Sequence, residues 1–365
     1  LSALDFKTIS EKQLVNKQMK INEVLKYART LNQHTQLYDI LKHRLINKGY
    51  IRSDKQKEDL NDLVLSELHL IANNSYQGFE AQKLHLLFQA TYYLNSGNYK
   101  SAIRYYQELI NLFNDNQHLI LNPPIYYLSA IQGILDSLCI AGLYHETPFF
   151  LSKLEELTQN EYSTEFILHL KTLIYIYKSN SLLQAGNFEQ ALELRDKQEN
   201  ELLKKVTSLG LESQLRLYLS FAVLGMYTKD YVQARKYMKK IFSLGKLFCA
   251  FPSYKIARLV NLLLQAELGN YDFFENEIIS IKRNIRFEKQ TYITEKLIFK
   301  FIQGYPLPSY EKARNKRWLQ YQKDIQKIEQ DKYERQLLKT FDVLAWIESK
   351  LTQRSLADIF IEKAH

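Results

Sequence analysis

Apolar residues recur at spacings of three and four along almost the whole chain, a pattern that predicts amphipathic α-helices. Two runs, 125–143 and 166–183, are nearly continuous in apolar residues and are interrupted only by residues such as Gln132, Asp136, His169 and Lys171. Helices that are apolar around most of their circumference are buried ones. We therefore expect these two runs to form inner helices.

The first 72 residues predict three helices without a clear repeat. An apolar stripe from Leu14 to Leu31 predicts the first helix, and a second is expected from about Thr35 to residue 48. The third is expected to begin at Ser53, because Ser53 and Gln56 have the spacing of a capping box.

A short turn motif recurs five times, in which glycine or a substitute is followed two residues later by an aromatic residue. The glycine position is occupied by Gly97, Gly142, Gly186, Lys229 and Gly269, so the spacings are 45, 44, 43 and 40 residues. A period in this range is typical of stacked repeat proteins. Each motif follows a predicted helix at the place where a left-handed residue is needed, which glycine adopts without strain.

Composition supports an all-α fold. The 365 residues include only 11 glycines and 6 prolines, too few for the many tight turns of an all-β protein. No stretch of about 18 apolar residues is present, so no membrane insertion is expected. Cys139 and Cys249 both have apolar neighbours and are expected to be small core residues, which favours a reducing, cytoplasmic location.

Together these patterns predict an α-solenoid of stacked antiparallel helical hairpins with repeats of 40–45 residues. We divide the chain into an N-terminal helical cap (1–78), about five hairpins (79–305) and a C-terminal charged helix with a capping helix (306–365). In the last part the apolar stripe shifts phase near 331–334, and a final helix is expected to begin at Ser355.

The first hairpin resembles the tetratricopeptide repeat. The resemblance rests on the run Leu86-x3-Ala90-x2-Tyr93-x3-Gly97-x-Tyr99-x2-Ala102-x3-Tyr106, parts of which recur at 186–191 and 222–238. The family's repeat has 34 residues, whereas this one is longer, and Phe274 stands where the last copy would have alanine. The chain is therefore similar to a divergent repeat protein of this kind, with about 79–305 covered.

This resemblance implies a non-catalytic scaffold or regulatory adaptor that binds a protein or peptide segment, such as an amphipathic helix, in a concave groove. The groove positions of the first helix in each hairpin are mainly apolar, and they are Leu84, Leu87, Thr91, Ile176, Asn180, Leu219, Val223, Leu259 and Leu263. Asn180 alone matches the polar residues with which family members bind a terminal carboxylate. The alternative is that these side chains pack inside a tightly wound superhelix and meet no partner.

Charge suggests a competing function. Residues 51–200 carry 11 basic and 18 acidic residues, whereas residues 201–365 carry 29 and 18. A basic edge over 229–317 would suit nucleic acid if helix packing gathered its members on one face. The candidate residues are Arg235, Lys239, Lys240, Lys282, Arg283, Arg286, Arg314 and Arg317.

No sequence signature of catalysis or of a cofactor is found. The chain lacks phosphate-binding glycine loops, nucleophile elbows and zinc-protease motifs, and no histidine is three or four residues from another histidine or a cysteine. We therefore expect no enzyme activity, no cofactor and no metal. Because the chain begins at Leu1, a further hypothesis is a regulatory repeat domain of a longer transcriptional or signalling protein. The sequence does not define the oligomeric state.

Overall fold

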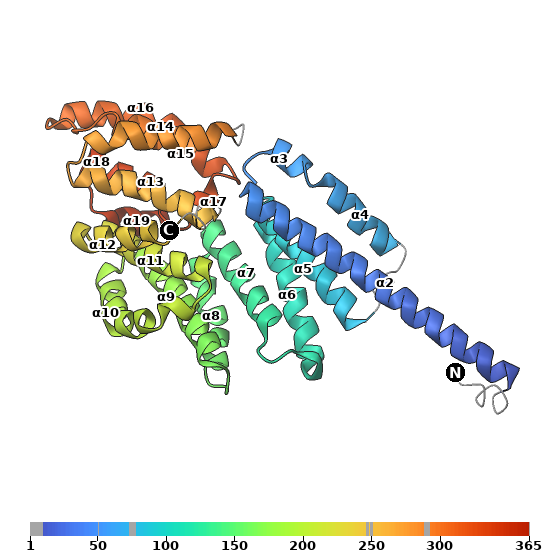
Figure 1. Ribbon diagram of the computed structural model, residues 1–365. Helices are drawn as coiled ribbons and strands as arrows, with labels where there is room; N and C mark the ends of the chain where they lie inside the picture. The colour runs from blue at the N-terminus through green and yellow to red at the C-terminus, as the bar shows by residue number, and fades with distance from the viewer. Residues whose placement is uncertain are drawn as a thin grey trace.

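The computed structural model describes residues 10–49, 51–72, 78–245, 248, 251–287 and 293–364, without the side chains of 48, 284–287 and 364. These ranges contain helices and no strand, so the predicted all-α class is confirmed (Figure 1). The predicted core residue Cys249 lies outside the described residues. The helices are α2 (Glu11–Lys48), α3 (Asp54–Glu58), α4 (Asn61–Ala72), α5 (Phe79–Asn95), α6 (Tyr99–Asp115), α7 (Ile125–Ala141), α8 (Thr147–Leu157), α9 (Thr164–Gln184), α10 (Phe188–Lys204), α11 (Leu211–Tyr227), α12 (Tyr231–Ser243), α13 (Pro252–Glu267), α14 (Asp272–Phe287), α15 (Ile293–Ile302), α16 (Glu311–Gln330), α17 (Arg335–Leu338), α18 (Val343–Thr352) and α19 (Leu356–Ala364).

Helices that follow one another in the chain pack together as hairpins. The pairs α5–α6, α7–α8, α9–α10, α11–α12 and α13–α14 all make contact, and the first helices of neighbouring pairs also touch, as in α9–α11 and α11–α13. As predicted, the apolar runs form the inner helices α7 and α9, whose buried residues include Leu135, Leu138 and Leu173.

All five turn residues adopt the left-handed backbone that the sequence predicts. The φ angles are 78° at Gly97, 78° at Gly142, 74° at Gly186, 62° at Lys229 and 74° at Gly269. Each lies directly after the first helix of a hairpin, within two residues of its end. The aromatic residue that follows is buried in the first motif, where Tyr99 at the start of α6 is 8% exposed, but it is exposed in the last, where Tyr271 is 43% exposed.

The predicted break between two N-terminal helices is wrong, because 11–48 form the single helix α2. Thr35 does not cap a new helix. Instead, its Oγ1 donates a hydrogen bond to the Leu31 carbonyl, 3.0 Å away within the same helix. No glycine or proline interrupts 31–35, so the helix continues through them.

The predicted third helix is divided into α3 and α4. Ser53 caps α3 as expected, since its Oγ accepts from the Gln56 N–H at 3.2 Å. The Gln56 side chain, however, accepts from the N–H of Arg52 at 2.7 Å rather than from Ser53. The chain turns at Asp59 and Leu60 before α4 begins.

A C-terminal segment, residues 331–342, crosses the ends of the hairpins, and we call it the strap. Its residues meet successive hairpins in chain order. The Tyr99 hydroxyl donates to the carbonyl of Lys332, Asn180 Nδ2 donates to that of Lys339 at 3.2 Å, and the N–H of Asp342 donates to the Tyr227 hydroxyl at 2.6 Å. Figure 1 shows α17, part of the strap, beside the end of α7. The strap therefore contacts the α5–α6, α9–α10 and α11–α12 hairpins near their turns.

The C-terminal helices share a core with the preceding hairpins. Trp346 and Phe360 are buried in one apolar cluster with Phe221 and Tyr227, and the Phe360 ring lies 5.3 Å from that of Tyr227. Asp358 N–H donates to Ser355 Oγ at 3.1 Å, as predicted for the last helix. The two parts form one packed body.

Candidate functional site

A cavity of about 260 Å³ lies where the strap crosses the inner helices. Its wall is formed by the end of α2, by α5, α7, α9 and α11, by the start of α13 and by the strap residues Gln336, Lys339 and Thr340. Ile46 on this wall is 49% exposed, so the cavity meets solvent near the end of α2. The cavity is thus internal but reachable.

A charged cluster forms part of the cavity wall. Asp136 Oδ1 accepts a hydrogen bond from the Tyr177 hydroxyl at 2.9 Å. The same oxygen lies 3.3 Å from Arg216 Nη2 and 3.2 Å from Lys339 Nζ. All three charged side chains are at most 18% exposed. The cluster joins α7, α9, α11 and the strap, and it places two cations and one carboxylate at the cavity.

The pKa shifts follow from burial and these partners. Burial alone would raise the pKa of Asp136, but Lys339 and Arg216 hold it below the ordinary value, so the carboxylate is ionised. Burial raises the pKa of Tyr177, which keeps the hydroxyl as a donor. Burial raises the pKa of Cys139 to about 12, so this thiol is neutral near pH 7 and a weak nucleophile.

Four of the nine predicted groove residues line the cavity together. They are Ile176 and Asn180 on α9 and Leu219 and Val223 on α11. Ile176 and Asn180 are half-buried, and Leu219 and Val223 are 1% and 3% exposed. These four residues therefore lie in one place, between the first helices of two neighbouring hairpins.

The other five predicted groove residues do not line the cavity. Leu84, Leu87, Leu259 and Leu263 are at most 7% exposed and pack in the interior, and Thr91 is half-buried on α5. For these residues the alternative of internal packing fits better. The wall is also less apolar than predicted, because Asp136, Arg216 and Lys339 contribute to it.

The residues of the predicted basic edge differ in how far their side chains are exposed. Arg235 and Lys239 on α12 and Lys282 and Arg283 on α14 are exposed. Lys240 is half-buried with its ammonium 5.4 Å from the Tyr218 ring centre. The side chain of Arg286 lies outside the described residues.

Two members of the predicted edge bind backbone instead. Arg314 is 8% exposed, and its Nη1 donates to the carbonyls of Pro308 and Ser309 at 3.1 and 2.5 Å. Arg317 Nη1 donates to the Gly304 carbonyl at 2.8 Å. Both guanidinium groups therefore donate hydrogen bonds to carbonyl groups of the loop between α15 and α16.

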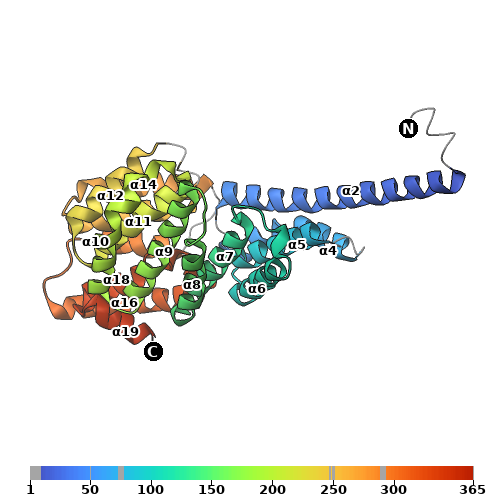
Figure 2. The ribbon, with the colours of Figure 1, turned by 90° about the horizontal axis from the view of Figure 1, so that it is seen from below.

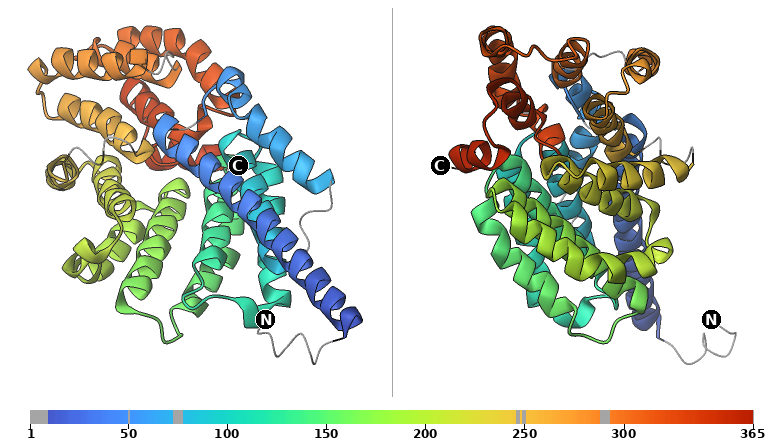
Figure 3. Two further views of the ribbon diagram at one scale, coloured as in Figure 1. Left: turned by 45° about the vertical axis from the view of Figure 1, so that its right-hand side comes forward. Right: turned by 90° about the vertical axis from the view of Figure 1, so that its left-hand side faces the viewer.

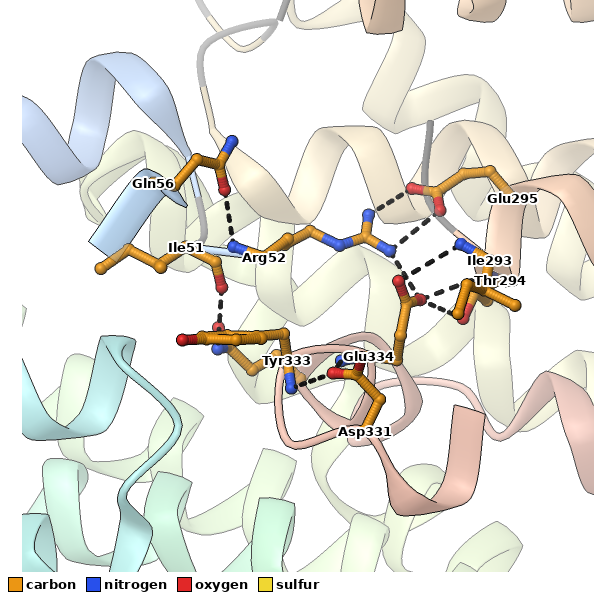
Figure 4. A network of polar contacts seen from close by, with 10 residues as sticks. Ile51, Arg52, Gln56, Ile293, Thr294, Glu295, Asp331, Tyr333 and Glu334 are labelled. Atoms are coloured by element: carbon orange, nitrogen blue, oxygen red, sulfur yellow. Dashed lines mark hydrogen bonds and ion pairs between the residues drawn. The ribbon is translucent and has the colours of Figure 1, made fainter. Parts of the chain in front are cut away.

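A second buried cluster joins the N-terminal part to the C-terminal part, and we call it the Arg52 cluster (Arg52, Thr294, Glu295 and Glu334; Figure 4). Arg52 pairs with both carboxylates, with Nη2 at 2.9 Å from Glu295 Oε2 and 2.8 Å from Glu334 Oε2. Glu334 also accepts from Thr294 N and Oγ1, at 3.2 and 2.6 Å, and so caps the start of α15. The three ionic side chains are 4–8% exposed.

Sequence reasoning missed the charged members of both clusters. The signal for Asp136 was present, since it stands within an almost continuous apolar run. The sequence did not show that Arg216 and Lys339 would join Asp136, because only the packing of α7, α11 and the strap brings the three side chains together.

No protein-family model, curated protein or solved structure gives a significant match to this chain. None of the helices in the described ranges is both long and apolar enough to cross a membrane. Within the same ranges, no three histidine, cysteine or carboxylate side chains gather as ligands for a metal ion.

Proposed function

We propose that the protein is a non-catalytic binding scaffold of stacked helical hairpins, similar to tetratricopeptide repeats, that takes a peptide segment of a partner protein into the cavity. One observation carries the proposal. Residues selected from the sequence as groove positions, Ile176, Asn180, Leu219 and Val223, lie together on the wall of one solvent-reachable cavity.

The chemistry of the wall suits a peptide. Ile176, Leu219 and Val223 offer an apolar surface for a side chain, while Asn180 and the Asp136 cluster offer hydrogen-bonding groups for a peptide backbone or a polar side chain. At about 30 Å³ per water molecule, the cavity has room for one or two side chains rather than a folded domain.

The rigidity of the site favours binding. Asn180 is held by the Lys339 carbonyl, and Asp136 is held by three partners, so their positions are fixed before a ligand arrives. A preformed site orders few of its own side chains on binding, which leaves more of the interaction free energy as affinity.

The test is selection of binders from a random peptide library displayed on phage, followed by titration of the selected peptides. Ile176→Ser and Asn180→Ala should weaken their binding about tenfold or more, since each removes a cavity contact worth about 1–2 kcal/mol. Matched controls are Ile279→Ser, at an isoleucine that is 55% exposed on α14, and Asn111→Ala on α6. If the cavity variants and the control variants weaken peptide binding equally, the peptides bind somewhere other than the cavity.

A further inference from the structure

The N-terminal half of α2 stands free of the rest of the molecule. Figure 2 shows it extending past every other labelled helix, and the views of Figure 3 agree. From Glu11 to Arg29 every side chain is exposed except Leu14, which is half-buried. Packing begins near Tyr27, whose ring lies against Gly78 at the start of α5.

This free half carries large apolar side chains that no described residue covers. Val15, Met19, Ile21, Val24 and Leu25 are between 48% and 65% exposed. Clustered exposed apolar residues are a mark of an interaction site in a folded protein. The surrounding charge is basic, since Lys12, Lys17, Lys20, Lys26 and Arg29 outnumber Glu11 and Glu23. Two such helices side by side would repel each other, so the complementary surface must be both apolar and acidic.

A surface of that kind exists elsewhere on the same chain. A hollow of about 460 Å³ lies between the α6–α7 and α8–α9 connections. It is lined by apolar and aromatic residues such as Leu121 and Tyr127, by the carboxylate of Glu161 and by amide side chains (Asn114, Gln117, Asn122 and Asn160). Leu121 is 61% exposed, and its neighbour Ile125 is 55% exposed. The hollow is therefore as uncovered as the free half of α2.

One carboxylate, Glu161, lines this hollow. Three more, Asp115, Glu156 and Glu165, are exposed within four positions of its lining residues in the sequence. Glu156 is close enough to Tyr127 to add to the raised pKa of that hydroxyl, after the larger effect of burial. None of the four forms an ion pair with a described side chain, so their charge is available to a basic partner.

We propose that the free half of α2 in one chain docks into the acidic hollow of a second copy. The two surfaces complement each other, because basic side chains surround the free half of α2, Glu161 lines the hollow, and both carry exposed apolar side chains. In a two-fold symmetric dimer each chain contributes one α2 and one hollow, so the contact forms twice. The buried area is then twice that of one contact, which brings it closer to the total of about 1,200–2,000 Å² that is usual for a stable interface. The proposal is independent of the cavity.

The first test is the mass of the full chain in solution by light scattering across a concentration series. We expect twice the 43.3 kDa of one chain for the wild type and the single mass for Leu25→Glu. The matched control is Leu319→Glu on α16, because Leu319 is 64% exposed and Leu25 is 62% exposed, and this variant should stay dimeric. Circular dichroism should show the same helix content in all three. A wild type that is monomeric at every concentration, or a dimeric Leu25→Glu, overturns the proposal.

The second test is a charge exchange. Lys17→Glu with Lys20→Glu, and separately Glu161→Lys with Glu165→Lys, should each weaken the dimer about tenfold or more in low salt. In a mixed dimer of the two double variants both contacts again pair opposite charges, so mixing should restore the dimer, and the quadruple variant should also regain the dimer of the wild type. If the quadruple variant is no tighter than either double variant, α2 and the hollow do not meet.

Discussion

Gly142 and Gly186 adopt the same left-handed backbone but differ in what surrounds them. A Cβ at Gly142 would meet no atom within 4 Å. A Cβ at Gly186 would lie 3.0 Å from the Ala357 carbonyl oxygen and 3.0 Å from Ile361 Cγ1, both on α19. The first glycine is required only by its φ angle, and the second is required by its φ angle and by a close contact.

We expect Gly142→Ala to lower the free energy of unfolding by about 1–2 kcal/mol, the strain of a left-handed alanine. Gly186→Ala should lower it by about 1–2 kcal/mol more, because α19 must also shift away from the new methyl group. Urea denaturation followed by circular dichroism measures both. Equal losses at the two sites would contradict the contact with α19.

The turn residues could be predicted from the sequence, because a left-handed φ angle is set by local backbone sterics and glycine is the residue that adopts it without strain. The sequence did not predict their contacts with α19 or with Lys332, which depend on how the C-terminal segment returns across the hairpins. For the same reason, Ile176 and Leu219 were found from the repeat pattern, whereas Lys339 was not.

Among the elements, the connection between α2 and α3 is joined to both α15 and the strap by the side chain of Arg52. Arg52 is the cation for two buried carboxylates, so the pair Glu295 and Glu334 depends on it. Burial raises the pKa of Glu295, although Arg52 opposes the rise. The break that the sequence analysis expected in α2 does not occur, and the chain turns instead at Gly49, just before Arg52.

Arg52→Met should lower the free energy of unfolding by about 3–5 kcal/mol near pH 7, because it leaves two buried carboxylates without their cation. The loss should shrink as pH falls toward 4.5, the ordinary pKa of glutamate, since a protonated Glu295 carries no unpaired charge. Thermal melts of both proteins from pH 4 to pH 8 measure the difference. The exposed pair Arg104–Glu108 supplies the control, and Arg104→Met should cost less than about 0.5 kcal/mol at every pH.

At the scale of the whole molecule, the strap should prevent the hairpins from unfolding independently of one another. In a linear array of repeats each unit contacts only its neighbours, and unfolding can spread from either end. Here the strap contacts α7, α9 and α11, and Arg52 joins residues 243 positions apart. These long-range contacts should make unfolding more cooperative than in an open array.

A chain ending at Gln330 tests this closure. It should unfold at lower urea concentration and over a broader range, and amide hydrogens of α7 and α9 should exchange faster, although no residue of those helices has changed. A chain ending at Thr352 is the control, because it keeps the strap and loses only α19. Unchanged protection of α7 in the shorter chain would mean that the strap is dispensable.

The Arg52 cluster also has a consequence for biosynthesis. At about 5–20 residues per second, a ribosome adds Glu295 roughly 12–50 seconds after Arg52. During that interval the guanidinium must remain hydrated, because its acidic partners do not yet exist. The nascent N-terminal helices can therefore reach their final arrangement only when synthesis is nearly complete, and a stalled chain would present an open edge to chaperones.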